Sequence, residues 1–291
     1  MIVLDDAEVR SRLRPEQAVR AVREAMAGDL VAPARLAADL GDGSVLFTAG
    51  RVPGVGYGFR AYDTRPTTSH DHVTVVYDDS TGQVRGVVVG PYLGEARTGA
   101  IGAVAVDALA SPDASILGLV GTGKQAWAQL WAIRSVRNLR EVRVFGREAS
   151  RREDFVTRCQ SELDLPARAV DSARAAVAGA EIVVLATNSG TPVIEASWVS
   201  AGAHVTSLGP KEIDRHECPV ELAGAAGVLV TDSLAQLDGY ATPYFLDGTP
   251  HRARMRSLAS VLTARPAPAE TTLFSSVGLA GTEVAVAATL L

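Results

Sequence analysis

One segment constrains the fold of this chain more than any other. In residues 115–126, SILGLVGTGKQA, a short apolar run leads into Gly121-x-Gly123-x-x-Ala126. This pattern predicts a strand, a tight turn at Gly121, a close approach of phosphate to Gly123, and a helix whose small Ala126 packs on the strand. The first N–H groups and the positive end of such a helix attract a pyrophosphate. The segment therefore predicts a nucleotide-binding strand–turn–helix unit.

The same loop also fits another class of nucleotide-binding protein. From Gly118 to Lys124 it has the glycine and lysine spacing of an NTPase phosphate-binding loop. That loop needs a serine or threonine after the lysine to bind Mg²⁺, and here the residue is Gln125. The dinucleotide interpretation is therefore favoured, with the NTPase loop as the alternative.

The next apolar segment bears on which dinucleotide is bound. A strand expected at Glu141–Phe145 ends at Gly146, Arg147 and Glu148, about where a dinucleotide fold meets the adenosine ribose. A carboxylate there accepts the ribose hydroxyls of NAD, whereas an arginine pairs with the 2′-phosphate of NADP. Arg147 thus favours NADPH/NADP over NAD, and Glu148 opposes this. Alternatively, the following arginines belong to a solvated helix start, because Ser150-x-x-Glu153 fits a capping box.

Composition excludes several classes of protein. The net charge of −5 argues against a nucleic-acid-binding surface. No apolar run approaches the ~18 residues that span a bilayer, and the N-terminus lacks a signal-peptide pattern, so we expect a cytoplasmic protein without nucleic-acid or membrane partners. Cys159 and Cys218 have no metal or redox spacing, and His70 and His72 lack a third ligand nearby. We therefore expect no metal site.

The pattern of elements changes near residue 113. Before it, an amphipathic helix at Pro15–Ala27 precedes five short strand candidates and a small-residue helix at Arg97–Leu109. After it, strands and helices alternate, as in a doubly wound parallel sheet. The strands are expected at Leu36–Leu40, Ser44–Ala49, Val55–Tyr62, His72–Asp78, Val84–Val89, Ile116–Val120, Val142–Phe145, Ala167–Val170, Ile182–Ala186, His204–Leu208 and Val228–Val230. We therefore expect an α/β fold with a boundary at Ser111–Asp113. The C-terminal tail, Leu273–Leu291, is too short for a domain of its own.

Several motifs, in order along nearly the whole chain, together resemble the ornithine cyclodeaminase/mu-crystallin family. They are Arg97-Thr-Gly-Ala100, Gly121–Ala126, Val144-Phe-Gly-Arg147, Ala186-Thr-Asn-Ser189, Ala201-Gly-Ala-His204 leading to Leu208-Gly209, Asp232-Ser233, and Ser276-Val-Gly278-Leu-Ala280. The resemblance implies a Rossmann NAD(P)-binding domain at 113–270. It also implies an α/β substrate-binding and dimerisation domain, formed by residues 1–112 with 271–291, that joins two subunits into a homodimer.

The resemblance also implies an activity and a set of site residues. Enzymes of this family move a hydride between a nicotinamide and a carbon–nitrogen centre beside a carboxylate. Arg35 and Arg97 occupy the positions that clamp the carboxylate, and a helix N-terminus at Arg97 would reinforce this. The cofactor-binding positions are Thr98, Gly121, Thr122, Gly123, Gln125, Ala126, Gly146, Arg147, Ala186, Thr187, Asn188, Leu208, Gly209, Asp232, Ser276 and Gly278.

Two departures from the family pattern change the expected chemistry. Arg60 aligns with the substrate-side lysine of the family, although another register would place Gly58 there. Lys211 replaces the acidic residue that cyclodeaminases carry after Leu208-Gly209. Because Lys211 would repel the distal ammonium of ornithine or lysine, we expect imine reduction, with Lys211 and Arg60 as catalytic groups. Lys211 would protonate the imine or bind a second acidic group; a solvent-facing loop lysine is the alternative.

The sequence thus predicts an NADPH-dependent reductase of a cyclic ketimine carboxylate, such as a pyrroline- or piperideine-carboxylate. An amino-acid dehydrogenase and an ornithine-type cyclodeaminase are the enzymatic alternatives. A cofactor-loaded ligand-binding protein with little turnover is the alternative from another class. Glu212 or Asp214 could restore an acid beside Lys211. The loop Asp63–His72 is expected to lie over the substrate pocket and help select the substrate.

Overall fold

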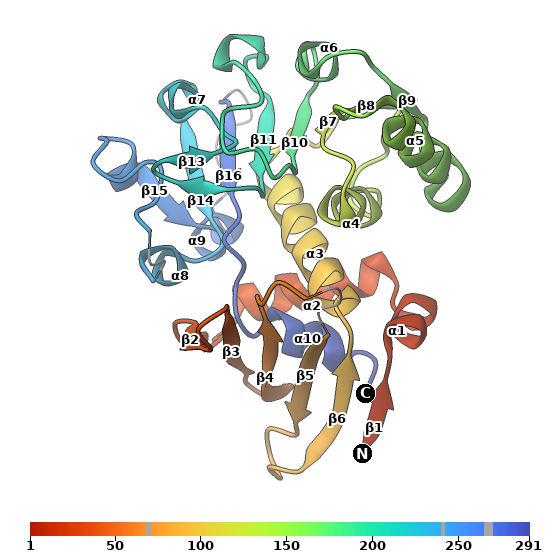
Figure 1. The fold of residues 1–291 in the computed structure, drawn as a ribbon, viewed down its shortest axis with the longest axis vertical. Coiled ribbons are helices and arrows are strands. Elements are labelled where there is room, and N and C mark those ends of the chain that lie inside the picture. The colour runs from red at the N-terminus through yellow and green to blue at the C-terminus, as the bar shows by residue number, and fades with distance from the viewer. Residues whose placement is uncertain (68–70, 240–241, 265–269) are drawn as a thin grey trace. The chain divides into compact units, whose positions relative to one another are not determined.

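The computed structural model describes residues 1–67, 71–239, 242–264 and 270–291 (Figure 1). The chain divides into two compact units, residues 1–101 with 278–291 and residues 102–277. The expected α/β class with a parallel dinucleotide-type sheet is confirmed. The boundary lies between residues 101 and 102, inside helix α3 (Tyr92–Leu109). The sequence analysis put it later, at Ser111–Asp113, after the end of this helix.

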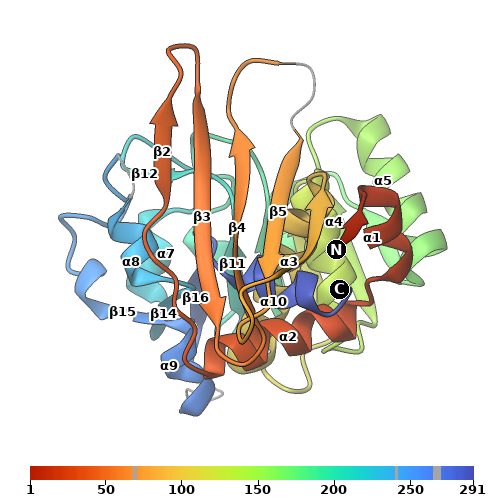
Figure 2. The ribbon, with the colours of Figure 1, turned by 90° about the horizontal axis from the view of Figure 1, so that it is seen from below.

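The first unit is built on a mixed sheet. Its order is β1-β6-β5-β4-β3-β2, with β1 parallel to β6 and the other neighbours antiparallel. Figure 2 shows β2 to β5 side by side. The elements are β1 (Ile2–Leu4), α1 (Asp6–Arg12), α2 (Pro15–Ala27), β2 (Leu36–Asp39), β3 (Ser44–Val52), β4 (Gly56–Asp63), β5 (His72–Tyr77), β6 (Val84–Val89), the first part of α3, and α10 (Thr282–Ala288).

Helices of the first unit cover one face of this sheet. Along β3, Thr48, Gly50 and Val52 are buried, whereas the alternating residues Phe47 and Ala49 are exposed. α10 packs on α2 and on strands β3, β4 and β5, so the two helices cover the buried face (Figure 1). The alternation places the polar Thr48 side chain on the inner face, next to α10.

Helix α3 begins earlier than the sequence predicted. Its first residue is Tyr92, and the Asp6 carboxylate accepts a hydrogen bond from the Tyr92 N–H at 3.0 Å. Arg97 therefore lies more than one turn inside the helix. Because the field of a helix end falls off within the first turn, the expected reinforcement by a helix N-terminus at Arg97 is wrong. An acid eighty-six residues upstream supplies the cap, and local sequence gives no sign of it.

The second unit is a doubly wound domain. Among the described residues its sheet has eight parallel strands in the order β15-β14-β16-β11-β10-β7-β8-β9. The strands are β7 (Ile116–Val120), β8 (Glu141–Phe145), β9 (Ala167–Ala169), β10 (Ile182–Leu185), β11 (His204–Ser207), β14 (Val228–Thr231), β15 (Met255–Ser257) and β16 (Thr272–Ser275). The helices are α4 (Lys124–Ile133), α5 (Ala149–Leu163), α6 (Ala173–Val177), α7 (Val220–Ala225), α8 (Leu234–Asp238) and α9 (Leu258–Thr263).

Strand β16 changes the assignment of the C-terminal tail. The sequence analysis placed residues 271–291 together with the N-terminal part. In the structure, β16 lies between β11 and β14 and is fully buried, and residues from Gly278 onward belong to the first unit. Leu273 and Phe274 supply the apolar side chains that favour this central position. The tail is therefore shared between the units.

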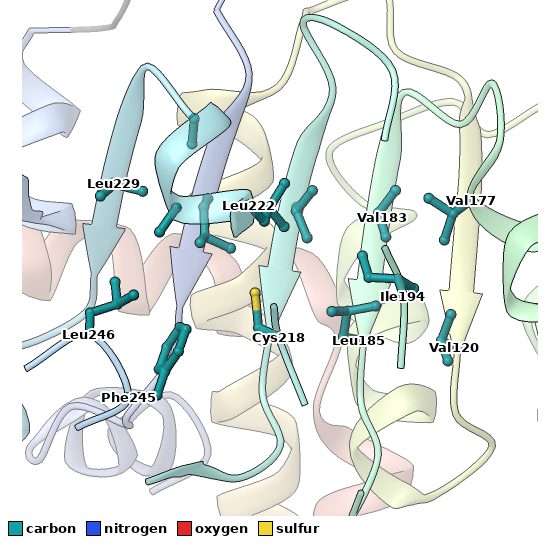
Figure 3. Packing of buried hydrophobic residues seen from close by; sticks show 14 of the residues in the cluster. Val120, Val177, Val183, Leu185, Ile194, Cys218, Leu222, Leu229, Phe245 and Leu246 are labelled. Carbon is teal, nitrogen blue, oxygen red and sulfur yellow. The ribbon is translucent and has the colours of Figure 1, made fainter. Parts of the chain in front are cut away.

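The core of the second unit is dense and apolar. Strand residues such as Val183 and Leu185 belong to one buried hydrophobic cluster with Leu222 of α7 and Phe245 (Figure 3). His204 is fully buried, with its ring nitrogens 2.8 and 2.9 Å from the hydroxyls of Thr272 and Thr206. Burial lowers the pKa of His204 to about 3.

Two kinds of feature are absent from the described residues: membrane-spanning helices and clusters of metal-binding side chains. No described helix is long and apolar enough to cross a membrane. Nowhere in residues 1–67, 71–239, 242–264 or 270–291 do three or more His, Cys, Asp or Glu side chains gather so that they could hold a metal ion. His70 lies outside these residues, as does part of the loop Asp63–His72.

Candidate functional site: a phosphate-binding turn and a buried arginine cluster

The turn after β7 requires its glycines. Gly121 has φ +121°, and a Cβ there would lie 2.2 Å from the carbonyl oxygen of Ala186. Gly123 faces open space and is the N-cap of α4, where no side chain caps the helix. The first-turn N–H groups of α4, including those of Gln125 and buried Ala126, therefore lack a side-chain cap. This arrangement fits a dinucleotide pyrophosphate.

The end of β8 presents the residues that were expected to select the cofactor. Gly146 packs on Thr122 of the turn, since a Cβ would lie 2.9 Å from the Thr122 methyl. Arg147 and Glu148 are exposed. The Glu148 carboxylate is paired with Arg151 at 2.9 Å, so its charge is partly neutralised. An arginine here is free to move toward a phosphate because its side chain extends into solvent.

The proposed capping box does not form. Helix α5 begins at Ala149 with Glu148 as its N-cap, and no side chain caps it. Ser150 therefore lies inside the first turn, and its hydroxyl contacts the Glu148 carboxylate at 3.3 Å. Arg152 is held differently: its Nη1 donates to the Gly146 carbonyl at 3.0 Å, which steadies the glycine that precedes Arg147.

A buried carboxylate that the sequence analysis missed joins the ends of β10 and β11. Glu217 is fully buried and accepts hydrogen bonds from the N–H and hydroxyl of Thr187, both at 2.8 Å, and from the Leu208 N–H at 3.0 Å. It also accepts from Ser207 Oγ and the Gly209 N–H. In the sequence, only the place of this acid just before a short apolar stretch could have indicated its role.

Glu217 thus brings together three positions that were expected to bind the cofactor. Thr187, Leu208 and Gly209 converge on it. Asn188 follows Thr187, and its carbonyl is 3.5 Å from Arg215. The carboxyl ends of neighbouring parallel strands are where ligands bind in such sheets.

The next strands carry a second acid with a similar role. Asp232, after β14, accepts from Ser276 Oγ at 2.9 Å and from the Val277 N–H at 2.8 Å. Asp232 and Ser276 are therefore brought together, as expected. Gly278 and Thr98 belong to the first unit instead. Gly278 has φ +79°, and the Thr98 hydroxyl donates to the Gly94 carbonyl of its own helix at 2.8 Å.

The first unit holds a buried ion pair at Arg97. The Arg97 side chain is 6% exposed, and its Nε lies 3.7 Å from the carboxylate of Glu283, which is fully buried. Thr48 Oγ1 donates to the same carboxylate at 2.7 Å. Glu283 is a further residue that the sequence analysis missed. Its signal is a single acid in the small, apolar segment of the tail helix.

Arg60 is the second buried cation, 8% exposed. Its Nη2 lies 2.7 Å from His72 Nδ1, and its Cζ lies 4.4 Å from the centre of the Tyr62 ring. Burial, followed by the charge of Arg97, lowers the pKa of Arg60 to about 10, while Glu283 opposes the shift. Half-buried Arg35 also lowers this pKa, so it acts on the same cluster. Arg60 remains charged at neutral pH.

This arginine cluster contains N–H donors that are not used in hydrogen bonds within the described residues. Arg97 Nη1 and Arg60 Nε are buried and make no hydrogen bond within the described part of the chain. Among the groups that shift the pKa of Arg60, Arg97 and Arg35 are cations and Glu283 is the one carboxylate. Unpaired buried donors are costly unless a ligand satisfies them. The cluster therefore fits an anion, and a carboxylate matches the planar fork of arginine.

Lys211 lies in the second unit, in the short strand β12 (Lys211–Glu212), which pairs with β13 (Arg215–His216). It is half-buried, and its Nζ donates to the Leu208 carbonyl at 3.3 Å. Its side chain is thus neither fully buried nor fully exposed to solvent. Glu212 is also half-buried, and Asp214 is exposed. Arg60 and Lys211 thus come from different units.

A parallel sheet with a glycine turn after β7 is typical of a nucleotide-binding protein, and the first unit of the same chain holds a buried arginine cluster. The model of the ornithine cyclodeaminase/mu-crystallin family matches residues 57–290. The chain therefore belongs to this family, and the resemblance found in the sequence is confirmed.

Individual relatives agree with this assignment. An uncharacterized cyclodeaminase of Sinorhizobium fredii is 37% identical over 169 residues, 58% of this chain and 51% of the relative. Ketimine reductase mu-crystallin of Mus musculus is 29% identical over 223 residues, 76% and 69% of the two chains. The match to the first of these thus spans about half of the relative's length.

A solved structure matches over nearly the whole fold. It is that of Thermococcus litoralis Δ1-pyrroline-2-carboxylate reductase in complex with NADH and L-proline. The two chains are 25% identical, with a TM-score of 0.88 and coverage of 99% of this chain and 95% of the other.

Proposed function

We propose that this protein is an NADPH-dependent reductase that converts a cyclic ketimine carboxylate, such as a pyrroline- or piperideine-carboxylate, to the amino acid. The observation that carries the proposal is the buried pair Arg97 and Arg60, whose unused N–H donors fit a carboxylate. The glycine turn after β7 supports a dinucleotide. The relatives named as ketimine and pyrroline-carboxylate reductases support the substrate class.

The proposal divides three tasks among three arginines and one lysine: holding the carboxylate, polarising the imine and protonating it. NADPH, when bound, supplies the hydride that reaches the imine carbon. Arg97 and Arg35 hold the substrate carboxylate through charge-assisted hydrogen bonds. Because Arg60 keeps its proton at neutral pH, it polarises the imine and does not protonate it. The proton for the imine nitrogen therefore comes from Lys211.

The function is tested by imine-dependent oxidation of NADPH. Purified protein with Δ1-pyrroline-2-carboxylate should consume NADPH, and Lys211→Ala should lower kcat about a hundredfold or more, since general acid catalysis contributes about 10²–10⁴-fold. The matched control is Glu212→Gln, the neighbouring residue in β12, which should change kcat by less than about threefold. Full activity of Lys211→Ala would contradict the proton-donor role. A binding protein without turnover would show NADPH binding but no imine-dependent oxidation.

The preference for NADPH rests on Arg147. NADPH should bind at least about tenfold more tightly than NADH, which corresponds to about 1.4 kcal/mol. Arg147→Ala should abolish this difference by weakening NADPH alone, because only NADPH carries a 2′-phosphate. Fluorescence titration with both cofactors measures it. Arg158→Ala, an exposed arginine later in α5, serves as the control. Tighter binding of NADH by the unmodified protein would assign the ribose to Glu148.

We also propose a homodimer, in which the open face of the first unit's sheet is the subunit contact. Leu36 and Phe47 are paired across β2 and β3, and both are exposed apolar residues. Phe59 and Val75, paired across β4 and β5, are partly exposed. The rings of Tyr57 and Tyr77, also paired across β4 and β5, stack 5.0 Å apart and enlarge this apolar surface. A continuous apolar sheet face of this kind is typical of an interaction surface.

A further inference from the structure

The Arg60 guanidinium is held by three elements of the first unit. The backbone of Gly94 in α3 comes so close that a Cβ there would lie 2.7 Å from Arg60 Cζ. The Tyr62 ring, from the same strand as Arg60, lies 4.4 Å from Cζ. His72, the first residue of β5, approaches Nη2 to 2.7 Å. Packing thus confines the plane of the guanidinium, and His72 fixes its remaining freedom through one directional bond.

The chemistry of this bond defines the state of His72. A guanidinium has only donors, so Nδ1 of His72 must be the acceptor. An imidazole that accepts through Nδ1 is neutral and carries its proton on Nε2. A protonated imidazole has donors at both nitrogens and cannot make this contact. The observed distance therefore requires the neutral Nε2–H form.

We propose that neutral His72 is the positioning residue of Arg60, so that protonation of His72 releases Arg60 and weakens binding of the substrate anion. This inference rests on the proposed function, in which the unused donors of Arg60 and Arg97 fit the substrate carboxylate and Arg60 also polarises the imine. His72 itself contacts Arg60 and need not touch the substrate.

The charges around the pair explain why protonation would release it. The groups facing the imidazole from β4 are Arg60 and the Tyr62 ring, whose centre lies 5.0 Å away. The charged groups that shift the pKa of Arg60 are the cations of Arg97 and Arg35 and the carboxylate of Glu283. An imidazolium would add a further positive charge at hydrogen-bond distance from a guanidinium in a poorly solvated place. Like charges at that distance repel strongly, so the contact would open.

The test compares pH profiles of three proteins with Δ1-pyrroline-2-carboxylate and saturating NADPH. For the unmodified protein, KM should rise about tenfold per pH unit on the acid side, because the released Arg60 no longer holds the substrate anion. His72→Asn places an amide oxygen near the position of Nδ1 but does not titrate, so the acid-side rise should disappear while KM at neutral pH stays within about threefold. His72→Ala should raise KM about tenfold or more at every pH, since it removes the acceptor.

Two outcomes would overturn the inference. One is an acid-side rise in KM that His72→Asn leaves unchanged, and the other is a neutral-pH KM that His72→Ala leaves unchanged. His251→Asn, in the second unit, is the control for replacing a histidine and should keep the profile of the unmodified protein. If His72 were merely structural, replacing it would lower stability but would leave the pH dependence of KM in place. Loss of the pH dependence in His72→Asn, with KM kept at neutral pH, therefore separates a positioning role from a structural one.

A measurement without turnover separates this inference from the proposed function. Nitrogen-15 NMR of the histidine rings should show His72 with an unprotonated, hydrogen-bonded Nδ1 and a protonated Nε2 at neutral pH. This tautomer together with no imine reduction would contradict the proposed function alone. Imine reduction together with a protonated Nδ1 would contradict the role of His72 alone.

Discussion

Replacing Arg97 with methionine should lower kcat/KM for the imine about a thousandfold, which corresponds to about 4 kcal/mol. Methionine keeps much of the length of the side chain but cannot donate to a carboxylate. The same change should destabilise the protein by about 3 kcal/mol, because it leaves the buried Glu283 carboxylate without its ion-pair partner. Thr48 and Arg60 remain near Glu283, which places the cost at the lower end of the usual range. Steady-state kinetics and urea unfolding measure the two effects.

A double variant separates the substrate role of Arg97 from its structural role. Arg97→Met with Glu283→Gln removes both charges, so most of the lost free energy of unfolding should return. Activity should not return, because the carboxylate clamp is still absent. Arg97→Lys keeps the charge but loses the bidentate fork, so its kcat/KM should lie between that of the unmodified protein and that of Arg97→Met. If the double variant recovered activity together with stability, Arg97 would have no direct role in substrate binding.

Replacing Glu217 with alanine should destabilise the second unit by about 3–5 kcal/mol. The change leaves the N–H groups of Thr187, Leu208 and Gly209 without their acceptor, together with the hydroxyls of Thr187 and Ser207. Since these backbone segments end β10 and β11 in the region assigned to the cofactor, affinity for NADPH should also fall, by about tenfold or more. Urea unfolding and fluorescence titration measure the two effects.

The controls for this prediction lie close by in the sequence. Glu217→Gln keeps one acceptor oxygen and should lose about half as much stability as Glu217→Ala. Glu221→Ala, an exposed acid in α7, should change the free energy of unfolding by less than about 0.5 kcal/mol. A Glu217→Ala protein within about 1 kcal/mol of the unmodified protein would show that water replaces the carboxylate without cost, and that Glu217 does not organise the strand ends.

Features set by neighbouring residues could be predicted from the sequence. Gly121 and Gly123 lie within one strand–turn–helix segment, so their spacing alone indicated the tight glycine turn that the structure contains. Strands such as Val84–Val89 and Ile116–Val120 were predicted with their observed bounds, because each is a run of β-favouring residues between turns.

Features set by distant residues could not be predicted in this way. The start of α3 depends on Asp6, and the burial of Glu283 depends on Thr48 and Arg97. Glu217 likewise acquires its role from strand ends that converge only in the folded sheet. In each case a polar residue looked unremarkable in its own segment, and only the tertiary structure supplies the partners that make it important.

The place of β16 affects how the protein can be made. Translation produces residues 272–275 after every other strand of the sheet, yet this strand separates β11 from β14. A nascent chain that stops short of it cannot join β14 and β15 to the remainder of the sheet. The segment that follows carries Glu283, the counter-ion of Arg97. Both units therefore complete their folding only after residues 272–288 have left the ribosome, and until then each is exposed to chaperones and proteases in an unfinished state.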